Sequence, residues 1–298
     1  QHKFGVGQRA LLPKKGSNPD VLIMTATPIP RTLAITLYGD LDISVINELP
    51  RGRVPVKTLH FIQKQRNKGY AIVKEELNYH RQAYIIYPVI EESYALDLAG
   101  AKKMFIQLKE GEFKNFRLGL IHGKLKEQEQ REIMSKFRRG ELDLLVSTTI
   151  LEVGIDIANA TCMIIESAER FGLSQLHQLR GRIGRGKLQS FCVLISDGES
   201  EEARARLAAM VESCDGFRIS EEDLKIRGPG EFFGSRQHGL AELKIANPLI
   251  QMRLLKAARQ EAIKLLAEDP RLQERPHQLL KGKLLQRFPE YEQLILVG

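Results

Sequence analysis

The stretch Q-L-H-Q-L-R-G-R-I-G-R-G, residues 175–186, decides how the rest of the chain is interpreted. It holds three arginines, Arg180, Arg182 and Arg185, within six residues, separated only by glycine and isoleucine. Because glycine is a poor helix former, we expect a helix that enters this stretch to end in a tight loop near Gly181. Glycine lets backbone approach a ligand closely, and the planar donor fork of arginine fits phosphate oxygens. The stretch is therefore suited to stabilising a transferring phosphoryl group, and the alternative is a basic surface loop without chemistry.

Composition sets broad limits on the kind of protein. The chain has 298 residues, enough for more than one domain, and its 43% hydrophobic and 28% charged residues are typical of globular proteins. A net charge of +8 and a pI near 9.3 favour a polyanionic partner. The three cysteines lack C-x-x-C spacing and the histidines lack metal-ligand spacing, which predicts reduced core cysteines and no metal site. We expect neither a transmembrane segment nor a signal peptide.

Strand and helix signals alternate along the middle of the chain, which predicts an α/β fold. Strands are expected at 58–62, 83–88, 117–122, 142–147, 161–166 and 191–196, with helices at 67–80, 97–110 and 126–139. Such alternation implies right-handed crossovers and a parallel sheet with helices on both faces. A short buried strand at 21–24 precedes this region, and the Pro- and Gly-containing segment 39–56 reads as an extended linker at a domain boundary.

Polar residues follow several of the predicted strands. They are Thr25 and Thr27 after 21–24, His122 at the end of 117–122, Thr148 after 142–147, and Glu166 at the end of 161–166. Open parallel sheets place their sites at the carboxyl ends of strands. Gly154, with Asp156 two residues further on, is the pattern of a ribose or phosphate contact, and a turn cap is the alternative for Asp156.

The character of the sequence changes after about residue 198. A charged helix is expected at 201–212, and a short second helix at 220–225 with a capping-box-like start. The glycine-rich stretch 227–239 also carries two arginines and Phe232-Phe233, which predicts a shaped loop; a flexible surface loop is the alternative. An amphipathic helix at 249–266 and a basic tail follow.

Together these segments resemble the superfamily-two helicase motors and, more closely, the RecG family of bacterial branched-DNA translocases. The resemblance covers essentially the whole chain. The segments that carry it are T-A-T-P-I-P-R-T (25–32), L-Y-G-D-L-D (37–42), I-E-E-S (90–93), H-G-K-L (122–125), S-T-T-I-L-E-V-G-I-D-I (147–157), E-R-F-G-L-S-Q-L-H-Q-L-R-G-R-I-G-R-G (169–186) and D-L-K-I-R-G-P-G-E-F-F-G-S-R-Q-H-G (223–239).

The resemblance implies a nucleotide-facing group of residues. Gln178, Arg182 and Arg185 match the last helicase motif, with Arg185 as the arginine finger and Arg182 as its partner. Gly154 and Asp156 lie in the motif that lines nucleotide and DNA at the interface between two motor lobes.

The resemblance also implies a group that couples nucleotide state to DNA. Thr25 and Thr27 match the helicase motif with that role. Arg206, Arg227 and Gln237 match the hairpin-and-loop element that, in this family, converts ATP-driven closure into translocation along duplex DNA.

Fold, domains and cofactors follow from the same resemblance. We expect a remnant of the first helicase lobe and a linker at 1–52, a RecA-like second lobe of the P-loop NTPase type at 53–197, and a C-terminal hairpin, loop and helices at 198–298. No G-x-x-x-x-G-K-[ST] occurs, and only Gln1-His2 of the family's D-E-Q-H magnesium motif is present. ATP and Mg²⁺ are therefore expected to bind the full-length protein, and this chain alone is expected to lack ATPase activity.

The partners implied are branched double-stranded DNA, at forks and Holliday junctions, and single-stranded-DNA-binding protein, with no membrane. A bacterial cytoplasmic, nucleoid-associated protein of DNA repair and recombination is expected. Three alternatives stay open: a fragment of the transcription-repair coupling translocase, an RNA helicase or restriction-type translocase, and a non-catalytic nucleic-acid-binding module. The 223–239 stretch favours RecG over an RNA helicase, and residues 37–42 and 227–239 favour it over the transcription-repair translocase.

Overall fold

The chain divides into two compact units, which are described separately. The computed structural model describes residues 52–88, 94–148, 157–233 and 252–287, together with residues 22, 24, 44–46, 48 and 50. One unit is Ile46–Gly228, and the other combines Gln1–Val45 with Pro229–Gly298. The domain roles expected for 1–52, 53–197 and 198–298 stay predictions.

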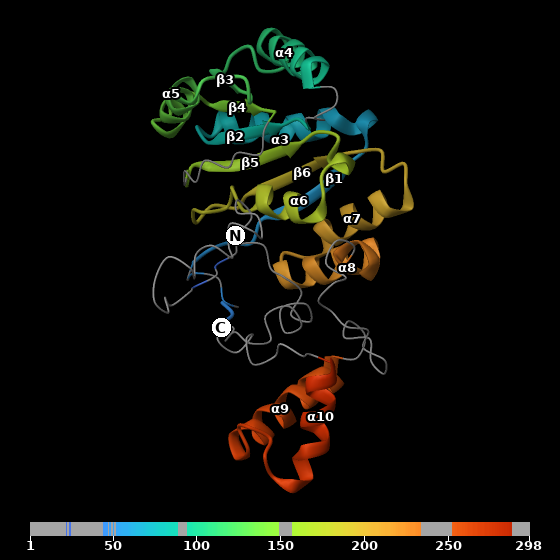
Figure 1. Ribbon diagram of the computed structural model, residues 1–298. Coiled ribbons are helices and arrows are strands. Elements are labelled where there is room, and N and C mark those ends of the chain that lie inside the picture. Colours follow the sequence, from blue (N-terminus) through green and yellow to red (C-terminus); the bar gives the residue numbers. More distant parts are fainter. Residues whose placement is uncertain are drawn as a thin grey trace. The chain divides into compact units, whose positions relative to one another are not determined.

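The larger unit is built on a six-stranded sheet (Figure 1). The strand order is β1-β6-β5-β2-β4-β3, and every neighbouring pair is parallel, so the predicted parallel sheet is confirmed. The strands are β1 (Lys57–Phe61), β2 (Gln82–Ile86), β3 (Leu118–Ile121), β4 (Leu144–Ser147), β5 (Ala160–Ile165) and β6 (Phe191–Ile195).

Helices cover both faces of this sheet, with α3 behind it and α6 in front of it in Figure 1. The helices of this region are α3 (Arg66–Asn78), α4 (Tyr94–Glu110), α5 (Glu127–Arg138), α6 (Leu173–Arg180), α7 (Glu201–Glu212) and α8 (Gly216–Phe233), with short 3-10 turns η2 (Gln63–Gln65) and η4 (Ala168–Arg170). Through β6, the helices and strands agree with the predicted ones to within a few residues.

Two hydrophobic cores, one on each face, explain why these segments form strands. Side chains of a strand alternate between the faces of its sheet. In β5, Cys162 and Ile164 enter the core shared with α3 and α4, whereas Met163 and Ile165 enter the core shared with α5, α6 and α7. Since both faces are covered, the strands are continuous apolar runs rather than alternating ones.

Two predictions about local structure are wrong. The predicted buried strand at 21–24 is not found at its two described residues, because Leu22 and Met24 do not have strand structure and are 81% and 72% exposed. The helix predicted at 220–225 is found as part of the longer α8, whereas the loop predicted at 227–239 is wrong for residues 227–233, which belong to the same helix. A helix that is already nucleated propagates at little cost, and glycine propensity is only a weak guide.

The smaller unit contains α9 (Met252–Glu268), the turn η5 (Arg275–His277) and α10 (Gln278–Arg287). Asp269 joins α9 to η5: its carboxylate accepts from the backbone N–H groups of Gln273 and Glu274 at 3.0 and 2.9 Å and contacts His277 Nδ1 at 3.0 Å. The bond from the Gln273 N–H is the largest of the effects that lower the pKa of Asp269 to about 2. Among the described residues, no helix is long and apolar enough to cross a bilayer.

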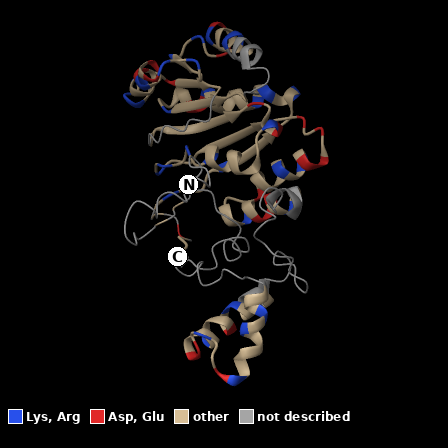
Figure 2. Cartoon of the chain, in the orientation of Figure 1, with Lys and Arg blue, Asp and Glu red and all other residues tan. Residues whose placement is uncertain are grey.

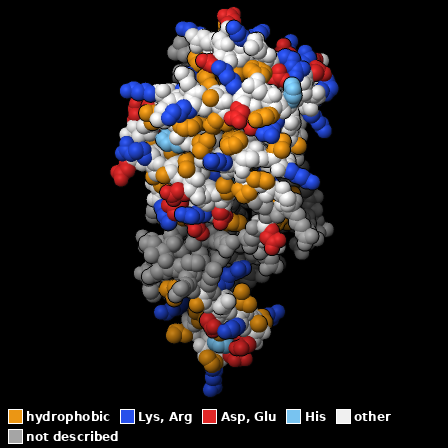
Figure 3. All heavy atoms as spheres, turned by 180° about the vertical axis from the view of Figure 1, so that it is seen from behind, with side chains coloured by type: hydrophobic (Ala, Val, Ile, Leu, Met, Phe, Trp, Pro, Cys, Tyr) orange, Lys and Arg blue, Asp and Glu red, His pale blue; other side chains and the backbone are white. Residues whose placement is uncertain are grey.

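Charged residues lie mainly on the helices and connecting loops, while the strands are almost free of them (Figure 2). On the face drawn in Figure 3, basic and acidic side chains are interspersed with hydrophobic ones. The net positive charge of the chain is therefore not gathered into one patch on that face of the described residues.

We expect Phe137→Ala to lower the free energy of unfolding by about 3–5 kcal/mol. Phe137 is fully buried on α5, and its ring lies 5.0 Å from that of Tyr84 in β2. Urea denaturation measures the change, with Ile106→Ala as the control, because Ile106 is 51% exposed. An equal effect of the two substitutions would contradict the assignment of Phe137 to the core.

Candidate functional site

The arginine-rich stretch forms the end of α6 and the loop after it, as predicted. At the start of α6 the Gly172 N–H donates to the Gln175 side chain at 2.9 Å. Leu173, Leu176 and Leu179 are fully buried and fix the helix on the sheet. The helix ends at Arg180, where the following glycine N–H donates to the His177 carbonyl.

Residues 181–186, the arginine loop, are held by backbone bonds to α6. The N–H groups of Arg182 and Ile183 donate to the carbonyls of Leu179 and Arg180 at 2.9 and 3.2 Å. Ile183 is fully buried, whereas Arg182 is half-buried and Arg185 is exposed. Arg185 Nε donates to the Gly181 carbonyl at 3.2 Å. The loop therefore presents its arginines from a rigid base.

Gly184 is required by the geometry of the arginine loop. Its φ is +70°, and a Cβ at this position would lie 2.5 Å from Cγ2 of Val56. Its carbonyl accepts a hydrogen bond from Arg53 Nε at 3.0 Å. Glycine alone combines a positive φ with so close an approach.

The arginine loop lies at the amino-terminal edge of the sheet. Val56, which Gly184 approaches, directly precedes β1. The carbonyl of Ala158, which lies just before β5, is 3.0 Å from a Cβ placed on Gly186. This is the edge opposite to the one at which open parallel sheets usually bind ligands.

Arg180, unlike its two neighbours in the motif, is buried, with only 4% of its surface exposed. Its Nη1 donates to the carbonyls of Met210 and Ser213 at 2.9 and 2.8 Å and to Thr58 Oγ1 at 3.2 Å. Its Nη2 lies 3.2 Å from His177 Nδ1. We call this group the Arg180 clamp; it joins α6, the end of α7 and β1.

His177 is, beside Thr58, an acceptor side chain of the Arg180 clamp. Burial, followed by the charge of Arg180, lowers the pKa of His177 to about 4, while Asp215 acts weakly in the opposite direction. The ring is therefore neutral near pH 7, which leaves Nδ1 able to accept from the guanidinium.

A second group of polar side chains occupies the opposite, carboxyl-terminal edge of the sheet. Each strand contributes the residue that directly follows its last one: His122 after β3, Thr148 after β4, Tyr87 after β2 and Glu166 after β5. The strands pair in register up to these positions, so the four side chains form one row on the face covered by α3 and α4. We call these four residues the polar edge row.

The two ends of the polar edge row differ in their hydrogen bonding. Glu166 is ion-paired with Arg66 at 2.8 Å and accepts from the Tyr70 hydroxyl at 3.0 Å. His122 Nδ1 and Thr148 Oγ1 are buried and lack a hydrogen-bond partner among the described residues. Burial is the largest cause that lowers the pKa of His122. Since buried polar atoms are nearly always satisfied, this end of the row is suited to receiving a ligand or water.

Burial also acts on the tyrosines around Glu166. It raises the pKa of Tyr87 to about 12, and the nearby Glu166 carboxylate adds to that effect. It raises the pKa of Tyr70 as well. Both hydroxyls are therefore protonated near pH 7, and that of Tyr70 donates to Glu166.

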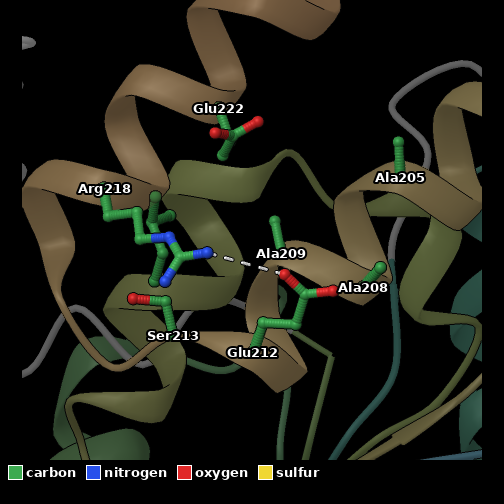
Figure 4. A pocket seen from close by; sticks show the side chains of 8 residues that line it. Ala205, Ala208, Ala209, Glu212, Ser213, Arg218 and Glu222 are labelled. Atoms are coloured by element: carbon green, nitrogen blue, oxygen red, sulfur yellow. Dashed lines mark ion pairs between the residues drawn. The ribbon is translucent and has the colours of Figure 1, made fainter.

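A small cavity lies elsewhere, between α7 and α8 (Figure 4). Its volume is about 170 Å³, below the 300–1,000 Å³ typical of ligand pockets. Arg218 on α8 faces Glu212 on α7 across it at 3.7 Å. No predicted site residue lines it, so it is not our candidate site. It is lined by Ala205, Ala208, Ala209, Glu212, Ser213, Arg218, Ile219 and Glu222.

Of the predicted DNA-coupling residues, Arg206 is described in full. It lies on α7, where Nη2 donates to the Glu169 carbonyl at 3.1 Å and Nη1 pairs with Glu202 at 2.8 Å. Glu169 belongs to η4, which follows the carboxyl end of β5.

The other predicted site residues fall into three groups. Gln178 is half-buried on α6 and lies beside the arginine loop, which carries Arg182 and Arg185. Arg227 lies in α8, but its side chain is not described. The described residues contain no cluster of His, Cys, Asp or Glu that could hold a metal ion. Outside the described residues lie Thr25, Thr27, Gly154, Asp156 and Gln237.

Two family descriptions match the chain. Residues 67–187 match "Helicase conserved C-terminal domain", and residues 213–288 match "ATP-dependent DNA helicase RecG, domain 3, C-terminal". The chain belongs to the RecG family.

Relatives named "ATP-dependent DNA helicase RecG" match nearly the whole chain. The protein of Synechocystis sp. is 51% identical over 97% of the chain, and that of Bacillus subtilis is 48% identical over 96%. The chain covers 34% and 42% of these two relatives, so it spans about a third to two-fifths of their length.

A solved structure of RecG bound to a three-way DNA junction is also similar. Its TM-score is 0.65 at 44% identity, and the match covers 86% of this chain and 32% of that one. The RecA-like fold expected from the sequence is confirmed by this match and by the parallel sheet.

Sequence reasoning missed the role of Arg180 and the full extent of the polar edge row. A helical signal for Arg180 exists, because it lies seven residues after Leu173 and four after Leu176, on the buried stripe of α6. Tyr87 carries no such signal, since only the strand order places it beside Thr148 and Glu166.

We expect Gly184→Ala to destabilise the chain by several kcal/mol, because it combines strain at positive φ with a clash against Val56. Gly140→Ala is the matched control: its φ is +72°, but nothing lies within 4 Å of the added Cβ. It should cost only about 1–2 kcal/mol. Denaturant unfolding measures both, and equal losses would contradict the close packing of the arginine loop.

We expect the chain to lose stability as the pH falls from about 6.5 to about 4, in part because of His177. The unfolded histidine takes up a proton in this window, whereas the folded one, with a pKa of about 4, does not. The loss attributable to it is at most about 3 kcal/mol. His177→Gln, which keeps an acceptor for Arg180 without titrating, should flatten the curve of melting temperature against pH. The exposed His60→Gln is the control, and an unchanged slope in His177→Gln would contradict the assignment.

Proposed function

We propose that the chain is the second motor lobe and C-terminal coupling region of an ATP-dependent DNA helicase that remodels branched DNA. The observation that carries this proposal is an arginine loop held rigidly at one sheet edge, in a chain of the RecG family. The names of its relatives, and the three-way junction bound in one of them, support the substrate class.

ATP is the nucleotide we assign, and Arg182 and Arg185 are the residues we assign to its γ-phosphate. The chemistry of the donors fits this group: two guanidinium groups lie on a tight glycine loop whose base is fixed by Ile183 and Gly184. Such side chains stabilise charge on a transferring phosphoryl group without reorganising during the reaction. Mg²⁺ and the phosphate-binding lysine would come from another part of the full-length protein.

The polar edge row is where we propose contact with the DNA backbone. His122 and Thr148 place side by side, at the carboxyl edge, two buried polar atoms that have no hydrogen-bond partner in the described part of the chain. Phosphate contacts of this kind position a protein on DNA without reading its sequence. The net charge of +8 favours the same partner.

A non-catalytic nucleic-acid-binding module is the second candidate. It is favoured by the same polar edge row, which needs no ATP to bind a phosphate. The two functions differ in what the arginine loop does, because a binding module needs no guanidinium aimed at a nucleotide.

We expect Arg185→Ala in the full-length protein to lower DNA-stimulated kcat for ATP hydrolysis by about 10³-fold or more, because an arginine finger contributes about 10³–10⁵ in rate. Affinity for a synthetic three-way junction should be nearly unchanged. Steady-state ATPase and fluorescence-anisotropy binding measure the two effects.

Arg138→Ala is the control, because it removes an equal charge from an exposed site on α5. It should leave kcat unaltered. If Arg185→Ala left kcat unaltered as well, the helicase proposal would fail, and the binding module would stand.

A further inference from the structure

We infer that Arg180 is a positioning residue: it couples α7 to the arginine loop, so that movement of α7 sets the placement of Arg182 and Arg185. The inference rests on the proposed function, and it adds a residue to which none of the matched motifs assigned a role.

The partners of Arg180 are unusual for a buried cation. Among the described residues they are two backbone carbonyls, a threonine hydroxyl and a neutral histidine, with no carboxylate. The carbonyls of Met210 and Ser213 belong to the last turn of α7 and its cap, where the helix dipole is negative and carbonyls lack helical partners. Arg180 thus satisfies the end of α7 and is itself satisfied by it.

α7 runs between the two edges of the sheet. Near its middle, Arg206 binds the Glu169 carbonyl just beyond the carboxyl end of β5. After its last residue, Cys214 Sγ lies 3.3 Å from the carbonyl of Val56, which precedes β1 at the amino edge. A helix of 12 residues is about 18 Å long, so α7 reaches from one edge toward the other.

The path from α7 to the arginine loop is short. The carbonyl of Arg180 accepts the N–H of Ile183, and Gly181 and Arg182 directly follow Arg180. A shift at the end of α7 therefore reaches the loop through one side chain and one hydrogen bond. Because the donor fork of Arg180 holds α7, α6 and β1 at once, a lysine cannot replace it.

The test is steady-state ATPase of the full-length protein carrying Arg180→Lys, with three-way-junction DNA. We expect DNA-stimulated kcat to fall about 100-fold, as for a catalytic group displaced by about 1 Å, and KM for ATP to change less than about twofold. Assays at least about 20 °C below the melting temperature of each variant keep unfolding out of the comparison.

Arg81→Lys is the matched control. On the other face of the sheet, Arg81 Nη1 donates to both carboxylate oxygens of the buried Glu76, at 2.9 Å each. None of the described partners of Arg81 lies on α6 or α7. It should lower the melting temperature and leave kcat unchanged.

The outcomes separate the inference from the function on which it rests. If Arg180→Lys lowers only the melting temperature, or lowers kcat no more than Arg81→Lys, Arg180 is structural and the inference is overturned. If Arg185→Ala leaves kcat unchanged, the proposed function itself fails, whatever Arg180→Lys does. Loss of kcat in Arg180→Lys and Arg185→Ala, but not in Arg81→Lys, supports both.

Discussion

The buried guanidinium of Arg180 holds the arginine loop in place, and its described partners include no carboxylate. Desolvating a cation is costly, so Arg180 is stable only where several acceptors converge on it. Met210 and Ser213 supply carbonyls from the end of α7, and Thr58 and His177 supply the remaining acceptors. Moving α6, α7 or β1 separately would leave this charge unsatisfied. A shift of α7 is therefore passed to α6 through Arg180, and the geometry of residues 181–186 depends on this contact.

The sheet separates the two parts of the candidate site. The arginine loop lies at the amino-terminal edge, whereas His122, Thr148, Tyr87 and Glu166 lie at the carboxyl-terminal edge. The function that we propose puts ATP at one edge and DNA at the other, and it therefore needs an element that spans both. α7 does so, with Arg206 near the carboxyl edge and its last turn against Arg180.

Much of the fold could be predicted because its signals are local. Strands buried on both faces are continuous apolar runs, and α6 ends where Gly181 begins the loop. The roles of the arginines are harder to separate, because Arg180, Arg182 and Arg185 are the same residue type in one motif, and only the spacing of Arg180 from Leu173 and Leu176 along α6 marks it for burial. The polar edge row depends on the strand order β5-β2-β4-β3, which no local pattern contains. The helical course of residues 227–233 contradicts local propensity.

Hydrogen exchange of the arginine loop tests the central claim most directly, since it needs neither nucleotide nor DNA. The amides of Gly181, Arg182 and Ile183 are bonded to carbonyls of α6. In Arg180→Lys we expect their protection to fall about tenfold or more, while amides of β2 and β5 keep theirs. If protection of the loop amides is unchanged, the claim that the buried guanidinium of Arg180 sets the geometry of the loop is contradicted. This holds whether or not the amides of α7 lose protection.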